Sequence, residues 1–87
     1  MSDYTFDIGQ PPFETFLAAG KGDRQKLMNT FLWLAKNPHE NGENSFYESP
    51  SRPVHQKRFG DWLITYLTDH GAKEVRIVRI NKLKRTL

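Results

Sequence analysis

The last third of the chain restricts the fold most, because it holds three β-type runs separated by turn residues. Val54–Phe59 ends at Gly60, Asp61–Thr68 is rich in aromatic and β-branched residues, and Glu74–Asn81 alternates apolar and basic side chains. The segment between the second and third runs begins Asp69-His70-Gly71, which is typical of a turn. These runs predict an antiparallel meander of three strands joined by two hairpins.

Alternation along these runs also predicts which side chains share a face of the sheet. Successive residues of a strand point to opposite faces. Strict alternation therefore places Val75, Ile77 and Arg79 on one face, and Arg76 on the other together with Ile80.

The beginning of the chain predicts a strand followed by a helix. Residues 4–8, with the sequence YTFDI, alternate and form a short strand at a sheet edge or beside the last hairpin. Pro11-Pro12 suits the first turn of a helix. Gly20 and Gly22 mark its end, since glycine is favoured just past a helix C-terminus.

A second helix follows, with Asp23 as its N-cap and Asn37-Pro38 as its end. Its apolar residues recur with a helical period and form a broad buried face: Leu27, Met28, Phe31, Leu32, Leu34 and Ala35. The two helices form a helical hairpin that covers one face of the sheet. The predicted fold is therefore α+β, in one domain over residues 1–87.

Residues 39–53 are polar and rich in turn residues, including Asn41-Gly42 and Ser49-Pro50. Structureless segments of this length are uncommon in small domains and are often functional. We expect a polar loop here, either mobile and ordered by a partner or a plain insertion.

Positive charge is concentrated in the second half of the chain. Residues 1–50 contain four Lys/Arg and seven Asp/Glu, a net of −3, whereas residues 51–87 contain nine and three, a net of +6. A basic half on a small domain favours a polyanion or an acidic protein segment as partner, and a solvated surface is the alternative.

Several classes of protein are disfavoured by what the sequence lacks. With no cysteine there is no disulfide and no thiolate chemistry. No apolar run approaches membrane-spanning length and no signal-peptide pattern opens the chain, so we expect a cytoplasmic protein without a membrane partner. His39, His55 and His70 are widely separated, so we expect no metal site and no cofactor.

The order of the predicted elements and the late motifs resemble the RelE/ParE superfamily of bacterial toxins. The resemblance rests on the opening strand, the helical hairpin ending LAKNP, and three pieces of the meander. These are the basic pair Lys57-Arg58 before Gly60, the aromatic-x-x-x-Tyr pattern Trp62–Tyr66, and the V-x-I-x-R-I pattern Val75–Ile80. The resemblance covers nearly the whole chain, and it rests on the order and spacing of these pieces.

The resemblance implies the toxin of a type II toxin–antitoxin module, with a cognate antitoxin protein as partner. RelE-type members cleave mRNA on the ribosome, and ParE-type members inhibit DNA gyrase without nuclease activity. The translation target is favoured here. A non-toxic basic nucleic-acid-binding module is an alternative from a different class.

Candidate site residues follow from the same resemblance. Lys57 and Arg58 match basic residues that RelE-like enzymes carry on the second strand of the sheet, and Arg85 matches an arginine just after the last strand. The sequence departs from the pattern at Leu63, where the family usually has arginine, and in having neither tyrosine nor histidine near its C-terminus.

The residues themselves suggest further roles. His55 is a candidate general base, because histidine titrates near neutral pH. Guanidinium groups match phosphate oxygens in a bidentate way, so arginines of the meander are candidates for holding charge on a reacting phosphate. The remaining candidate phosphate contacts are Arg76, Arg79, Lys82 and Lys84.

Overall fold

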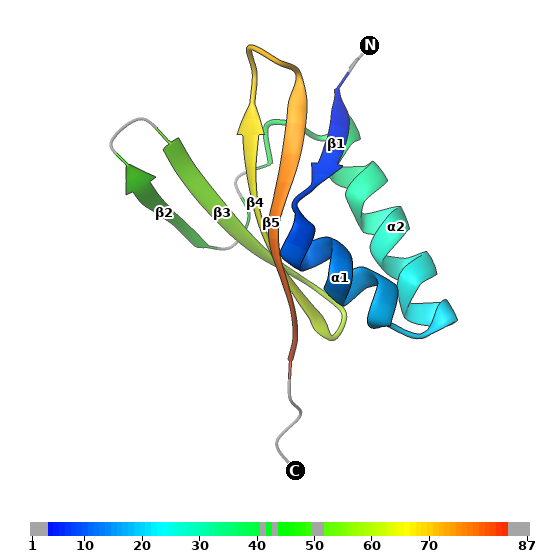
Figure 1. Ribbon diagram of the computed structural model, residues 1–87. Helices are drawn as coiled ribbons and strands as arrows, with labels where there is room; N and C mark the ends of the chain where they lie inside the picture. Colours follow the sequence, from blue (N-terminus) through cyan, green and yellow to red (C-terminus); the bar gives the residue numbers. More distant parts are fainter. Residues whose placement is uncertain (1–3, 41, 43, 50–51, 84–87) are drawn as a thin grey trace.

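Two helices lie on one face of a five-stranded mixed sheet (Figure 1). The structure is a computed structural model that describes residues 4–40, 42, 44–49 and 52–83. In chain order the elements are β1 (Thr5–Ile8), α1 (Gln10–Ala18), α2 (Lys21–Lys36), β2 (Asn44–Ser49), β3 (Arg52–Phe59), β4 (Trp62–Asp69) and β5 (Glu74–Lys82). This arrangement confirms the predicted α+β class, the helical hairpin and the late meander.

The strand order in the sheet is β1-β5-β4-β3-β2. β1 pairs with β5 in parallel, and all other neighbouring pairs are antiparallel. The opening strand therefore lies at an edge beside the last hairpin, as its sequence predicts.

The core lies between α2 and the middle of the sheet. α2 contributes Leu27, Phe31 and Leu34, which are at most 1% exposed. The strands contribute the facing residues Trp62, Ile64, Tyr66, Val75, Ile77 and Ile80. Burial of this apolar stripe against the sheet stabilises α2 more than helix propensity does.

The helix boundaries differ from the prediction at one point. α2 begins at Lys21 with Gly20 as its N-cap, so Gly22 lies inside the helix rather than between helices. Asp23 is in the first turn of the helix and is not the N-cap residue. Its carboxylate still suits that position, because the N-terminal end of a helix carries partial positive charge.

The prediction of a loop over residues 39–53 is wrong for most of that segment. Residues 44–49 form strand β2, and β3 already begins at Arg52. The β2 sequence NSFYES has no clear alternation, and its strand geometry comes from antiparallel pairing with β3, where Ser45 lies opposite His55. An edge strand tolerates polar residues because one side of its backbone faces solvent.

A bulge in β5 changes which residues share a face. Arg79 pairs with Thr65 and Ile77 pairs with the next residue, Tyr66, so Val78 is an extra residue in the ladder. Such an insertion shifts the alternation by one residue. Ile80 therefore joins Val75 and Ile77 in the core, and Arg79 lies on the opposite, exposed face, which corrects the sequence-based prediction.

Candidate functional site

The basic pair of β3 is divided between the two faces of the sheet. Lys57 faces the helices, where its Nζ lies 6.0 Å from the centre of the Trp33 ring of α2. Arg58 is the next residue and is exposed on the other face. On that face Gln56 donates a hydrogen bond to the Thr65 hydroxyl at 3.3 Å. Lys57 and Arg58 therefore lie on opposite faces of the sheet.

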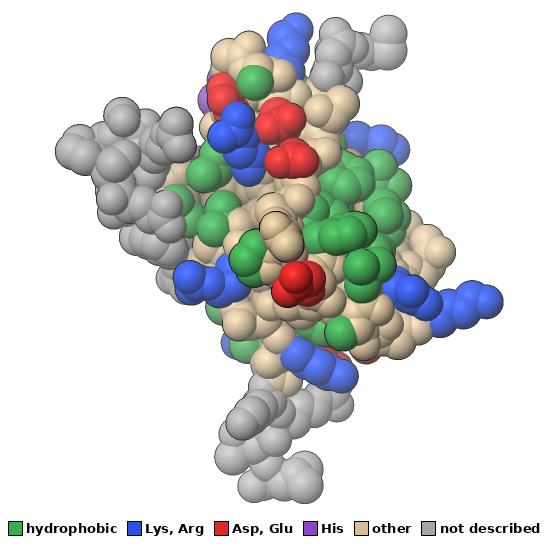
Figure 2. All heavy atoms as spheres, viewed as in Figure 1, with side chains coloured by type: hydrophobic (Ala, Val, Ile, Leu, Met, Phe, Trp, Pro, Cys, Tyr) green, Lys and Arg blue, Asp and Glu red, His purple; other side chains and the backbone are tan. Residues whose placement is uncertain are grey.

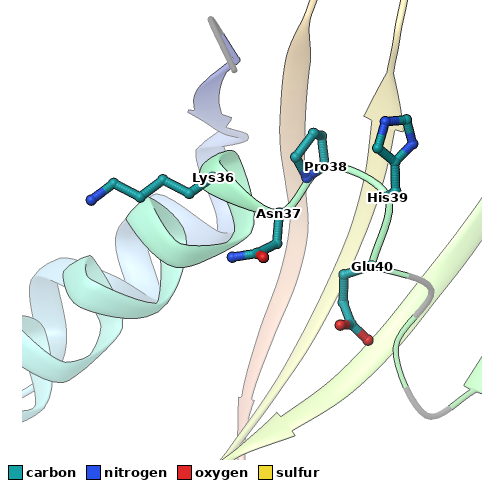
Figure 3. Close-up of a pocket in the computed structure, with 5 residues that line it drawn as sticks. All are labelled: Lys36, Asn37, Pro38, His39 and Glu40. Atoms are coloured by element: carbon teal, nitrogen blue, oxygen red, sulfur yellow. The ribbon is translucent and has the colours of Figure 1, made fainter. Parts of the chain in front are cut away.

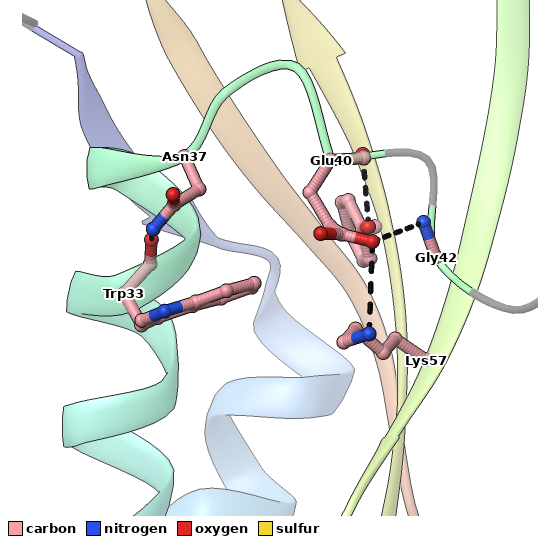
Figure 4. Close-up of polar contacts among 6 residues, drawn as sticks. Trp33, Asn37, Glu40, Gly42 and Lys57 are labelled. Carbon is pink, nitrogen blue, oxygen red and sulfur yellow. Dashed lines mark hydrogen bonds and ion pairs between the residues drawn. The ribbon is translucent and has the colours of Figure 1, made fainter.

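On the helix side, Lys57 belongs to an anchor that attaches the segment after α2 to β3 (Figure 4). Its Nζ lies 3.6 Å from the Glu40 carboxylate. The same carboxylate oxygen accepts the Gly42 N–H at 3.0 Å. The Asn37 amide closes the helix end by donating to the Trp33 carbonyl at 2.8 Å. This cluster holds the chain as it leaves α2.

Tyr66 of β4 holds the segment after α2 by a further hydrogen bond. Its hydroxyl donates to the Glu40 carbonyl at 3.0 Å, and the residue is 1% exposed. Burial raises the pKa of Tyr66 well above its usual value, and the nearby charge of Glu40 raises this pKa further. The His55 ring centre lies 5.6 Å from the Tyr66 ring centre, so His55 also lies on the helix side, away from Arg58.

Gly42 passes very close to β3. Its φ is +70°, and a Cβ there would lie 2.5 Å from the Gln56 carbonyl oxygen. Only glycine fits both the backbone conformation and the space.

A pocket of about 340 Å³ lies beside this segment and is lined by residues 36–40 (Figure 3). Lys36 and His39 point in opposite directions from it. The His39 ring stacks on His70 with centroids 5.0 Å apart, and the Tyr4 hydroxyl is 2.6 Å from Nδ1 of His70. These contacts connect the residue before β1 and the β4–β5 turn with the segment after α2.

The face of the sheet away from α1 and α2 holds a different set of side chains. One row across the strands runs Arg58, Leu63, Asn81, and the next runs Gln56, Thr65, Arg79. Arg58, Arg79 and Asn81 are exposed, Leu63 is half-buried, and Thr65 is 2% exposed. Two arginines thus occupy opposite corners of one polar patch.

Arg76 lies on this face but is neutralised by acidic neighbours. Its guanidinium is 2.9 Å from Glu74 and 3.7 Å from Asp69. The hydrogen bond and charge of Glu74, with smaller contributions from Asp69 and Asp7, raise the pKa of Arg76. Figure 2 shows acidic and basic side chains gathered together above the centre of that view. By contrast, no ion pair of Arg79 is found within the described ranges.

The other predicted basic residues fall elsewhere. Lys82 lies on the helix side, 3.8 Å from Asp23 and 5.7 Å from the centre of the Trp62 ring. Lys84 and Arg85 lie outside the described residues. Of the eight candidates, the structure therefore brings Arg58, Arg76 and Arg79 to the uncovered face and separates them from His55, Lys57 and Lys82.

The part of the chain that the structure describes has neither a metal-binding cluster nor a membrane-spanning helix. No group of three or more His, Asp or Glu side chains there is arranged to hold a metal ion. In the same part of the chain, no helix is both long and apolar enough to cross a membrane.

Comparison with known proteins gave matches only among solved structures. No protein-family model matches the sequence, and no curated protein matches it significantly. The archaeal RelE–RelB complex from Pyrococcus horikoshii OT3 superposes with a TM-score of 0.77 at 15% identity, covering 99% of this chain and 100% of that chain.

Two E. coli structures give similar results. The isolated RelE toxin has a TM-score of 0.71 at 16% identity and covers 95% of this chain and 87% of that chain. The intact RelBE toxin–antitoxin complex has a TM-score of 0.69 at 16% identity, with coverages of 94% and 99%. These likenesses span nearly the whole domain, and they show that this chain has the fold of the RelE toxins.

Proposed function

We propose that this protein is the toxin of a type II toxin–antitoxin module and that it inhibits translation by cleaving mRNA on the ribosome. The fold of the RelE toxins supports the toxin role. Two of the similar structures are complexes of RelE with RelB, which supports a cognate antitoxin as partner. The proposed site of action is the cytoplasm, where ribosomes and mRNA meet.

The observation that carries the proposal is the position of Arg58 and Arg79. Both are exposed on the sheet face that the helices leave uncovered. They are separated by two strand spacings and two residues, so their Cα atoms lie roughly 12 Å apart. Two long guanidinium side chains at this separation can hold neighbouring phosphates of one RNA strand.

The proposed chemistry is attack of a ribose 2′-hydroxyl on the adjacent phosphorus. The 2′-hydroxyl gives up its proton, the P–O bond to the 5′-oxygen breaks, and the departing oxygen takes up a proton, so that a 2′,3′-cyclic phosphate and a free 5′-hydroxyl form. Negative charge builds up on the phosphorane oxygens in the transition state. Removing one well-placed donor to such a charge typically lowers kcat by about 10²–10³-fold.

The proposal gives Arg58 and Arg79 this electrostatic role and keeps Arg85 as a further candidate cation from its position after β5. It assigns proton transfer to none of the described residues, because the His55 ring packs beside Tyr66 on the helix side. Lys57 contributes to the anchor through Glu40 rather than to the reacting phosphate.

Pulse labelling in bacteria tests the proposal. After induced expression we expect incorporation of labelled methionine to fall within minutes and before that of labelled thymidine. The Arg58→Ala/Arg79→Ala double variant should abolish the effect. A Lys21→Ala/Lys26→Ala double variant is the matched control, because it removes two exposed cations from α2.

Circular dichroism of both double variants checks that they fold. If thymidine incorporation falls first, the target is gyrase or another part of DNA replication. If neither label falls, the protein is not a toxin of either kind.

A further inference from the structure

The polar patch on the uncovered face has an apolar centre. Leu63 lies on β4 between Arg58 on β3 and Asn81 on β5, and all three side chains point the same way. Thr65, the next residue of β4 on this face, is buried, and its hydroxyl accepts a hydrogen bond from Gln56. The diagonal from Arg58 to Arg79 crosses β4 between Leu63 and Thr65, and Leu63 is the more accessible of these two residues.

We propose that Leu63 and Asn81 form a subsite for one unpaired base of single-stranded RNA, which lies between phosphates held by Arg58 and Arg79. The inference rests on the proposed function, and it adds the RNA contact that would discriminate between sequences. Phosphate contacts made by the two arginines would carry no sequence information directly. A base placed on the Leu63–Asn81 side of the line between the two arginines would meet the Leu63 side chain with its face and the Asn81 amide with its edge.

The chemistry of the two side chains suits these roles. The surface of a sheet can bind bases that are splayed out from a single strand, because each base has an apolar face that packs on exposed side chains. The Asn81 amide offers one donor group and one acceptor side by side. That pair matches the N6 amino group and N7 of adenine, so we expect adenine to be preferred.

The patch favours a single strand over a duplex. The bases of a duplex are stacked, and side chains of a sheet cannot place a base face on Leu63 without unstacking it. Unpaired bases are available without that penalty, and backbone contacts from two arginines would hold the strand in register.

Binding of short RNAs to the purified protein tests the subsite directly. The probes are fluorescently labelled oligo(A), oligo(C) and oligo(U) of about 12 nucleotides, within the usual site size of small single-strand binders. Anisotropy at roughly 50 mM salt and at higher salt gives both the affinity and its salt slope. We expect oligo(A) to bind about fivefold more tightly than the other two.

Each variant has a distinct expected result. Asn81→Ala should remove the adenine preference and leave the salt slope unchanged. Leu63→Ala should weaken all three probes several-fold, again without a change of slope. Arg79→Ala should lower the slope by about 0.7, which corresponds to one lost phosphate contact.

Matched controls come from the helix side. Asn29→Ala and Leu32→Ala remove an exposed amide and an exposed leucine from α2, and both should bind like the parent protein. The inference is overturned if Asn81→Ala and Leu63→Ala also bind like the parent, or if the parent binds no probe or shows no base preference. Growth inhibition, measured with the same variants, separates the two proposals. If the protein blocks translation but does not bind these probes, the proposed function stands and the base subsite is refuted.

Discussion

Replacing Tyr66 by phenylalanine tests the anchor that holds the segment after α2 against the sheet. The change removes one oxygen atom and leaves the Glu40 carbonyl without the donor that now lies 3.0 Å away. An unsatisfied, partly buried acceptor costs about 1 kcal/mol at the lower end of the usual range. For a domain of this size that lowers Tm by roughly 4–8 °C.

At high pH the Tyr66→Phe variant should instead be more stable than the parent protein. Because the pKa of Tyr66 is raised in the folded protein, the folded state keeps its proton at a pH where the unfolded chain, with an ordinary pKa of about 10, has lost it. Stability from this residue is therefore fully present below about pH 10 and falls by up to about 1.4 kcal/mol per pH unit above it. Tyr66→Phe lacks this loss, so the two stability curves should cross near pH 10.5–11, at about the point where the linkage term reaches 1 kcal/mol.

Urea unfolding followed by circular dichroism between pH 7 and pH 11.5 measures both effects. The control is Tyr4→Phe, which removes an exposed hydroxyl beside His70 and keeps the buried phenol. It should stay close to the parent at pH 7 and keep the alkaline loss. Parallel curves for Tyr66→Phe and the parent across the whole range would refute the buried, hydrogen-bonded phenol.

Three further changes test other parts of the structure. Gly42→Ala forces a Cβ to within 2.5 Å of a β3 carbonyl at a positive φ, and should destabilise the domain by more than about 1 kcal/mol in urea unfolding. Phe31→Ala empties a fully buried site and should lower the free energy of unfolding by about 3–5 kcal/mol, a large share of the total for 87 residues. Arg76→Gln should leave growth inhibition intact and change stability by less than about 1 kcal/mol, because its ion pairs are exposed.

Much of the fold is predictable from the sequence because its strongest patterns are local. The apolar face of α2, the proline after it and the short runs bounded by glycine and aspartate all specify elements directly. β2 could not be predicted in this way. Its residues NSFYES carry little strand signal, and pairing with β3 supplies the hydrogen bonds that make it a strand.

The arrangement of the candidate site was less predictable than the elements. A signal that Lys57 and Arg58 diverge was present, since neighbours on a strand point to opposite faces. The position of Arg79 was missed because strict alternation was assumed through Ile77-Val78, although these two consecutive apolar residues break the alternation where the one-residue bulge lies. The ion pair of Lys57 with Glu40 depends on the path of the segment between α2 and β2, which is set by tertiary structure.

The central claim is that the uncovered sheet face carries the toxic function, and two adjacent residues test it most directly. Lys57→Met and Arg58→Met each remove one charge, keep a long side chain, and alter opposite faces of the same strand. Growth is measured after induced expression, with circular dichroism to confirm that both variants fold. We predict that Arg58→Met relieves growth inhibition and that Lys57→Met retains it. Loss of inhibition in folded Lys57→Met together with full inhibition by Arg58→Met would place the function on the helix side and contradict the account.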